Sequence, residues 1–295
     1  MNQNAQKLRQ ALQQQSYLMM PGIYDCLSAK MAENAGFQAA FFSGGAFSMA
    51  TLGKPDIGFF NLTEAVHTLR RIVDSVNIPI LSDGDNGFGN AIHAADTARA
   101  FETIGVAGIQ VDDQVLPQSI PCTSKECNEW RYVEPKLIAI RKAVSPEFVI
   151  LFRTIANITD DLDKAIWRIN RAAELGADYA YVDGLKSYEE AQQVAAQAKI
   201  PLLINMNEKG ACAKIPLEQI KALNYRIGLY PVASVTAAAQ AYCNLFRTIH
   251  ETGSTLGYVD SMYSIKQLMN DMGLQDLTDT YRVSYTHLRA HETSA

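Results

Sequence analysis

The stretch "ILSDGDNGFGN" at residues 80–90 places two carboxylates, Asp83 and Asp85, directly after an apolar run and among three glycines. Side chains at positions i and i+2 of an extended chain point to the same side, so these carboxylates repel each other unless a positive charge lies between them. At ~4 Å and an effective dielectric constant near 20 the repulsion is about 4 kcal/mol. The pair therefore indicates a binding site for a proton or a cation.

Other polar residues also stand where apolar runs end. The acids are Asp112, Asp113 and Asp183, with Asp56 in a nearby loop, and the remaining residues are Ser43, Gly44, Gly45, Gln114, Arg153, Asn205 and Asn207. If these ends meet at one mouth, several acids face a single arginine, and the charge balance requires a cation. Mg2+ fits, with Mn2+ as a substitute, because it binds one or two carboxylates and completes its shell with water and substrate oxygens.

Two further features at these ends suit an anionic substrate. Ser43-Gly44-Gly45 offers consecutive backbone N–H groups with no bulky side chain in the way, and such groups can bind an oxyanion or a carboxylate. Arg153 closes a strongly apolar run, where an unpaired charge is costly, so we expect it to meet an anion. That anion is either an acid of the site or a substrate carboxylate.

The elements that must position these residues alternate regularly along the chain. Eight short apolar runs, typical of strands buried on both faces, alternate with helical patterns over roughly 230 residues. This alternation predicts a (β/α)8 TIM barrel in one domain over residues 1–282, with an open doubly wound sheet as the structural alternative. An extra helix is expected at 3–15, and one or two more after residue 258. Thr63 is a candidate N-cap of the helix that starts near residue 62. The strands are expected at 18–25, 39–45, 78–85, 107–114, 147–154, 178–184, 201–207 and 225–232.

Composition narrows the class of partner and the compartment. The 295-residue chain carries a net charge of −5, which argues against nucleic acid or an anionic membrane as a partner. No apolar run is long enough for a membrane span and the N-terminus lacks a secretory signal, so a cytoplasmic protein is expected. The five cysteines are scattered, and Cys26, Cys212 and Cys243 are interpreted as packing residues. With only His67, His93 and His250 in the body of the chain, a zinc site is not expected.

Residues 283–295 form a tail that we interpret separately. The run "VSYTHLRAHET" has neither a helical nor a strand period, and it resembles the translation of a sequencing-library adapter. It is expected to be non-native and is left out of the fold prediction.

The motifs "SGGAF", "LGKPDIGFFNLTE", "PILSDGDNGFGN", "GIQVDDQ", "LFRT", "PLLINMNEKG" and "YRIGLYPV" together resemble the isocitrate lyase/phosphoenolpyruvate mutase superfamily. The likeness is greatest to its 2-methylisocitrate lyase-like branch and runs from about Pro21 to Gln240. It implies a Mg2+-dependent (β/α)8 enzyme that makes or breaks a C–C or P–C bond next to a pyruvate-type enolate. It also implies a homodimer or homotetramer with helices swapped between subunits.

The resemblance also implies roles for individual residues. Asp83 and Asp85 would hold the metal, directly or through water, with Asp112 in support and Asp56 in the metal-proximal loop. Ser43, Gly44 and Gly45 would bind the pyruvyl carboxylate and the enolate oxygen. Arg153 would bind a carboxylate, with Asn205 nearby, and Asp183 stands where the family usually has Glu. Two other departures are Gln110 and Asp112, where the family often has His and Glu, and Ile155, where an acid is common.

The largest departure lies in the loop "PQSIPCTSKECNEWRYVEP". Lyases of the family carry a Lys-Lys/Arg-Cys-Gly-His run there, and its cysteine protonates the departing carbanion. Here Cys127 preserves a Lys-x-Cys spacing, whereas Cys122 lies closer to the expected distance from the fourth strand. Either thiol is a candidate acid, and an unactivated thiol with a pKa of about 8.5 is the alternative.

Four functions remain open from the sequence. The first is a Mg2+-dependent C–C lyase that acts on a small 2-oxo or 2-hydroxy di- or tricarboxylate. A decarboxylase or hydrolase of oxaloacetate-like acids needs the same metal and oxyanion site but no loop acid. A metal-free aldolase would use Lys186 as a Schiff-base nucleophile. The last is a catalytically silent barrel, suggested by Gln110 and Ile155.

Overall fold

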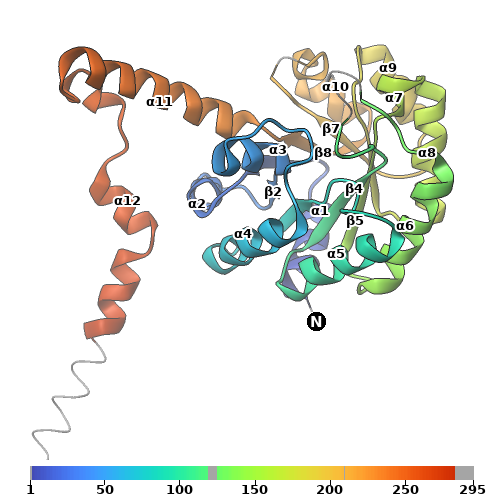
Figure 1. The fold of residues 1–295 in the computed structure, drawn as a ribbon, viewed down its shortest axis with the longest axis horizontal. Coiled ribbons are helices and arrows are strands. Elements are labelled where there is room, and N and C mark those ends of the chain that lie inside the picture. Colours follow the sequence, from blue (N-terminus) through green and yellow to red (C-terminus); the bar gives the residue numbers. More distant parts are fainter. Residues whose placement is uncertain (1, 119–124, 209, 283–295) are drawn as a thin grey trace, which may run out of the picture. The chain divides into compact units, whose positions relative to one another are not determined.

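A computed structural model describes residues 2–118, 125–208 and 210–282 (Figure 1). The chain divides into two compact units, Met1–Ala237 and Ala238–Ala295, and each is described by itself. The barrel lies entirely in the first unit. The expected single domain over residues 1–282 stays a prediction, and the tail at 283–295 lies outside the described residues.

Eight parallel strands close into a barrel in the order of the sequence, because β1 pairs with β8 as well as with β2. The predicted (β/α)8 barrel is therefore confirmed, and the open doubly wound sheet is wrong. All eight expected strands are present. They are β1 (Leu18–Ile23), β2 (Ala40–Phe42), β3 (Ile80–Asp83), β4 (Gly108–Asp112), β5 (Val149–Thr154), β6 (Tyr179–Val182), β7 (Leu202–Asn205) and β8 (Tyr225–Tyr230).

Helices follow the strands of the barrel and surround it (Figure 1). Several of them begin at side-chain N-caps, which are Asp25, Asn61, Asn90, Asp161 and Ser187. The helices of this unit are α1 (Gln3–Gln14), α2 (Cys26–Asn34), α3 (Gly44–Phe47), η1 (Ser48–Leu52), α4 (Leu62–Ser75), α5 (Ala91–Thr103), α6 (Trp130–Ala143), α7 (Ala156–Thr159), α8 (Leu162–Glu174), α9 (Tyr188–Gln197), η2 (Cys212–Lys214) and α10 (Leu217–Ala222).

Two local predictions need correction. The N-cap of α4 is Asn61 and not Thr63, because Asn61 Oδ1 accepts the N–H of Glu64 at 3.2 Å. The second strand stops at Phe42, and Gly44 already starts α3, although the apolar run suggested a strand through Gly45. Ser43 Oγ accepts the N–H of Ala46 at 3.2 Å, so this serine ends the strand by capping a helix.

The barrel interior is a separate apolar core. Alternate strand residues point inward, and they include Phe41, Leu81, Leu151 and Leu203. Leu8 of α1 packs against the same cluster, so the extra N-terminal helix contributes to the interior core. The residues one position further along the strands pack outward against the helices in a second, larger core.

The second unit begins within α11 (Ala233–Thr252) and continues through η3 (Leu256–Ser261) and α12 (Ile265–Asp271). Residues 274–282 are also helical, which confirms the expected C-terminal helices. Many large apolar side chains here are exposed in the single chain, among them Tyr242, Phe246, Leu256, Ile265 and Leu277. None of the described helices is long and apolar enough to cross a membrane.

Candidate active site

The inward alternation of the strands continues to their carboxyl ends, where polar side chains replace the apolar ones. Leu81 is followed two residues later by Asp83, Leu151 by Arg153, and Leu203 by Asn205. These ends surround a cavity of about 210 Å3. The predicted site residues that line it are Ser43, Gly45, Asp56, Asp83, Arg153, Asp183 and Asn205.

Asp83 and Asp85 form a tight turn directly after β3. The N–H of Asp85 donates to Asp83 Oδ1 at 3.1 Å, and Asp85 adopts a left-handed backbone with φ of +45°. The carbonyl of Asp85 accepts the N–H of Asp112 at 2.9 Å, which ties the turn to β4. A non-glycine residue in this conformation stores strain, and such strain clusters at functional sites. Asp85 lines a neighbouring cavity of about 650 Å3.

The pKa values of both acids are raised, mainly by burial. Burial raises the pKa of Asp83 to about 6, against the lowering effect of Arg153, and the carboxylates of Asp112 and Asp56 raise it further. Burial also raises the pKa of Asp85 well above its usual value, followed by the charge of Asp83. A cation beside this pair would remove the cost of ionising both groups.

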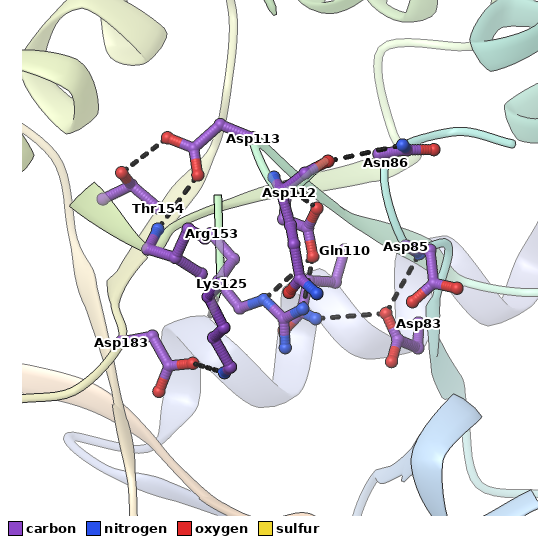
Figure 2. Close-up of polar contacts among 12 residues, drawn as sticks. Asp83, Asp85, Asn86, Gln110, Asp112, Asp113, Lys125, Arg153, Thr154 and Asp183 are labelled. Atoms are coloured by element: carbon purple, nitrogen blue, oxygen red, sulfur yellow. Dashed lines mark hydrogen bonds and ion pairs between the residues drawn. The ribbon is translucent and has the colours of Figure 1, made fainter. Parts of the chain in front are cut away.

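The groups beside these acids fit a hard cation. Gln110 of β4 donates from Nε2 to Asp83 Oδ1 at 3.2 Å (Figure 2), while its buried Oε1 has no hydrogen-bond partner among the described residues. Carboxylate and amide oxygens are the donors that Mg2+ takes, together with several waters. Within residues 2–118, 125–208 and 210–282, no three His, Cys, Asp or Glu side chains form a metal-binding cluster. The donor set suits Mg2+ held by two carboxylates and water.

Asp112 is turned toward Arg153. Both Nε, at 3.1 Å, and Nη2 of Arg153 donate to Asp112 Oδ2, and the N–H of Gln114 donates to Asp112 Oδ1 at 3.0 Å. Burial would lower the pKa of Arg153, but the carboxylates of Asp112 and Asp83 raise it well above its usual value. Asp112 therefore supports the site by fixing a permanent positive charge.

Ser43, Gly44 and Gly45 present the start of a helix. The first N–H groups of a helix have no acceptor within it, so those of Gly44 and Gly45 are available to an anion. An ideal Cβ on Gly45 would lie 2.6 Å from Asp56 Oδ2, and one on Gly44 would lie 3.2 Å from Asp83 Oδ2. Glycine therefore lets the backbone approach the acids of the cavity closely.

Across the cavity, Asp183 and Asn205 join through a residue that the sequence analysis missed. Tyr181 donates to Asp183 Oδ1 at 2.6 Å and accepts from Asn205 Nδ2 at 2.7 Å. Tyr181 lies two residues before Asp183 on β6, so the strand period could have indicated it. Lys125 was also missed. It lines the same cavity, with its Nζ 3.4 Å from Asp183 Oδ2, and no periodic pattern places a residue of this loop (Figure 2).

The loop cysteines are placed differently from the other predicted residues. Cys127 bridges to Gln114 through the backbone, packs against the outer core and is not among the residues that line the 210 Å3 cavity. Burial, with the nearby charge of Asp113, raises the pKa of its thiol to about 12. Cys122 lies outside the described residues. A catalytic role for either cysteine stays a prediction.

Asp113 follows Asp112 directly in the sequence, but its carboxylate is hydrogen-bonded to β5 and α8 and does not line the cavity. Its carboxylate accepts from Thr154 Oγ1 at 2.6 Å, from the N–H of Ile155 at 2.9 Å and from Arg168 Nη1 at 2.8 Å. Burial raises its pKa, and these hydrogen bonds and Arg168 oppose the rise. Asp113 thus joins β5 to α8 behind the mouth, and Ile155 uses its backbone there.

Lys186 is exposed and does not line the cavity. Its N–H donates to Glu190 Oε2 at 2.7 Å near the start of α9. Nothing in this setting desolvates its amine, which a Schiff-base nucleophile requires.

A closed (β/α)8 barrel with paired acids and a fixed positive charge at the carboxyl ends of its strands has the layout of an enzyme active site of this fold. The family model described as phosphoenolpyruvate phosphomutase matches residues 8–250. The chain belongs to this family, and its membership in the isocitrate lyase/phosphoenolpyruvate mutase superfamily, predicted from the sequence, is confirmed. With that membership the chain is an enzyme of this superfamily, and carbon–carbon lyases are among its relatives.

Similar proteins are known from both sequence and structure. A 2-methylisocitrate lyase of Halalkalibacterium halodurans is 34% identical over 92% of this chain and 90% of its own length. A 2,3-dimethylmalate lyase of Eubacterium barkeri is 31% identical over 93% and 96%. The structure of oxaloacetate acetylhydrolase with 3,3-difluorooxalacetate matches with a TM-score of 0.89 and 28% identity, over 95% of this chain and 97% of that one. Phosphonopyruvate hydrolase with oxalate and Mg2+ matches with a TM-score of 0.85 and 25% identity, over 94% and 97%.

Proposed function

We propose that this protein is a Mg2+-dependent lyase that cleaves, or in reverse forms, a C–C bond in a small 2-hydroxy or 2-oxo di- or tricarboxylate. The observation that carries the proposal is the mouth of the barrel. Asp83 and Asp85, whose pKa values are raised, lie two residues apart at the end of β3. Gln110, whose Oε1 has no partner among the described residues, hydrogen-bonds to Asp83, and Arg153 lines the same cavity as Asp83. The lyases among the relatives support the same reading.

When bound, Mg2+ supplies a Lewis acid that stabilises negative charge developing on the substrate. Asp83 and Asp85 hold the metal, and Gln110 positions Asp83. The N–H groups of Gly44 and Gly45 donate to the carboxylate or oxyanion of the pyruvyl end. Arg153, held by Asp112, presents a fixed positive charge to a second anionic group of the substrate.

The test is a panel of malate-, citrate- and methylisocitrate-type acids assayed for release of pyruvate or glyoxylate, with Mg2+ and with EDTA. We expect metal-dependent release from at least one acid, and a loss of about 100-fold or more in Asp83→Asn, the range seen when a preorganised electrostatic group is removed. Asp74→Asn is the matched control, because Asp74 is 65% exposed on α4. Full activity after complete chelation, or in Asp83→Asn, would refute the proposal.

A second candidate is a hydrolase or decarboxylase of oxaloacetate-type acids. It is favoured by the likeness to oxaloacetate acetylhydrolase and by the position of Cys127, which does not line the cavity. Such an enzyme needs the metal and the oxyanion site but no loop acid. From oxaloacetate, oxalate and acetate would identify the hydrolase, and pyruvate and CO2 the decarboxylase. Either result, without release of a 2-oxo acid from any hydroxy acid, would select this candidate.

We also propose a homodimer or homotetramer in the cytoplasm. The support for assembly is the row of exposed apolar side chains in residues 238–282, which include Phe246, Leu256 and Ile265. Sedimentation of the full chain tests it, and a monomer at micromolar concentration would contradict it. The location rests on composition and cysteine usage.

A further inference from the structure

Lys125 makes a long and partly exposed ion pair at the mouth of the barrel. Its Nζ lies 3.4 Å from Asp183 Oδ2, its side chain is 35% exposed, and it lines the cavity of about 210 Å3 (Figure 2). Arg153, the other cation among the described lining residues, uses both Nε and Nη2 on Asp112. A long, partly exposed pair is worth at most about 1 kcal/mol, so Asp183 leaves Lys125 able to bind a second anion.

Asp183 does not depend on Lys125 for its hydrogen bonds. Its Oδ1 already accepts from Tyr181 at 2.6 Å and from the N–H of Gly184 at 2.9 Å. Although burial would raise the pKa of Asp183, Arg153 and Lys125 lower it, so it is a carboxylate at neutral pH. This carboxylate holds the ammonium of Lys125 at the cavity wall, where two further N–H donors of the ammonium have no partner among the described residues.

Lys125 and the proposed metal ligands Asp83 and Asp85 lie on different sides of the barrel mouth. Asp83 ends β3, whereas Asp183 follows β6, with β4 and β5 between them in the closed sheet. A substrate oriented by a metal at Asp83 and Asp85 therefore extends toward the side where Lys125 lies. An acid with carboxylates at both ends can reach both charged regions.

We propose that Lys125 binds the substrate carboxylate distal to the metal and thereby selects dicarboxylates over monocarboxylates. This proposal rests on the proposed lyase function for the orientation of the substrate. Lys125 acts as a binding residue, Asp183 and Tyr181 hold it in position, and Asn205 completes that wall through Tyr181.

The experiment compares two probes by calorimetric titration in the presence of Mg2+. Succinate represents the distal half of the substrate, and oxalate, whose carboxylates are adjacent, represents the half at the metal. The variants are Lys125→Met and Lys125→Arg. Lys221→Met is the matched control, because the Lys221 side chain is 36% exposed and pairs with Glu218 at 2.9 Å on α10.

Lys125→Met is expected to weaken succinate binding by about tenfold or more and oxalate binding by less than about twofold, in line with the loss of one charged hydrogen bond. Lys125→Arg is expected to recover most of the succinate affinity. In turnover, the same loss is expected in KM for a dicarboxylate, with kcat within about threefold.

Equal losses for both probes, no loss for succinate, or a fall in kcat at unchanged KM would each overturn the proposal. The last result would identify Lys125 as a proton donor. If the wild-type protein turns over no acid of the panel, the lyase function fails, but the two titrations still decide whether Lys125 reads a distal carboxylate.

Discussion

Asp112 and Arg153 occupy paired positions on the neighbouring strands β4 and β5, and two nitrogens of the guanidinium donate to one oxygen of the carboxylate. The Asp112 side chain is fully buried and that of Arg153 is 18% exposed. The strand register thus brings these two charges together at the centre of the mouth.

Arg153→Met is expected to destabilise the fold by about 3–5 kcal/mol, because it leaves Asp112 as a buried charge without its partner. Chemical denaturation measures the change. The double variant Asp112→Asn/Arg153→Met is expected to recover part of this loss, because the stranded charge is gone. Additive losses in the double variant would show that the two side chains do not act as a pair.

The raised pKa of Asp83 determines how we expect the stability of the metal-free protein to depend on pH. Its pKa rises from 3.8 to about 6 in the fold, so the folded state binds more protons than the unfolded chain between these values. The stability that Asp83 contributes is fully present below pH 3.8 and is lost as the pH rises through about 6. Asp83→Asn is therefore expected to stabilise the metal-free protein at pH 8 by about 3 kcal/mol.

The binding of Mg2+ should show the opposite pH dependence. Because the metal binds the ionised carboxylates, its affinity is expected to rise as the pH increases through about 6. Thermal denaturation with and without MgCl2 between pH 5 and pH 8 measures both effects. A shift in Tm with Mg2+ that is as large at pH 5 as at pH 8 contradicts this assignment.

Asp113 and Arg168 predict a loss of stability without a direct effect on chemistry. Their side chains are 0% and 3% exposed, and they pair at 2.8 Å behind the mouth. Arg168→Met is expected to cost about 3–5 kcal/mol, since Asp113 would then be buried without its cation. The folded fraction should still bind Mg2+ with wild-type affinity. A selective loss of Mg2+ binding would place Asp113 in the metal site instead.

We expect a substitution at Gly45 to lower activity with little loss of stability. A methyl group there would lie 2.6 Å from Asp56 Oδ2, so Gly45→Ala is expected to displace Asp56 and to lower kcat/KM by about tenfold or more. Gly257→Ala is the control, because its methyl group would approach only Thr248, at 3.4 Å. Wild-type kinetics of Gly45→Ala would show that Asp56 has no role in the site.

Substitution of the two loop cysteines distinguishes the lyase from the hydrolase or decarboxylase. Cys127 packs beside Asp113, and its pKa is raised to about 12, so we expect Cys127→Ser to keep kcat within about threefold. Cys122 is then the remaining candidate acid, and Cys122→Ser should abolish C–C cleavage if the protein is a lyase. Unchanged turnover in both variants would favour the hydrolase or decarboxylase.

The sequence by itself determined the order of strands and helices, because a strand buried on both faces shows a short continuous apolar run and a helix with one apolar face shows a period of 3.6 residues. It also determined which acids stand at strand ends, since an apolar run that stops in "DGD" can be read without any neighbour. Asp83, Asp85 and Arg153 were found in this way, and the structure brings Asp83 and Arg153 into one cavity.

Only the tertiary structure decided which partner each charge meets. Asp112 and Asp113 are consecutive in sequence, yet one pairs with Arg153 in the mouth and the other with Arg168 of α8 behind it. Lys125 meets Asp183 across 58 residues of sequence, from a loop without a period. Strand register and barrel closure create these contacts, and both depend on packing between segments that are distant in sequence.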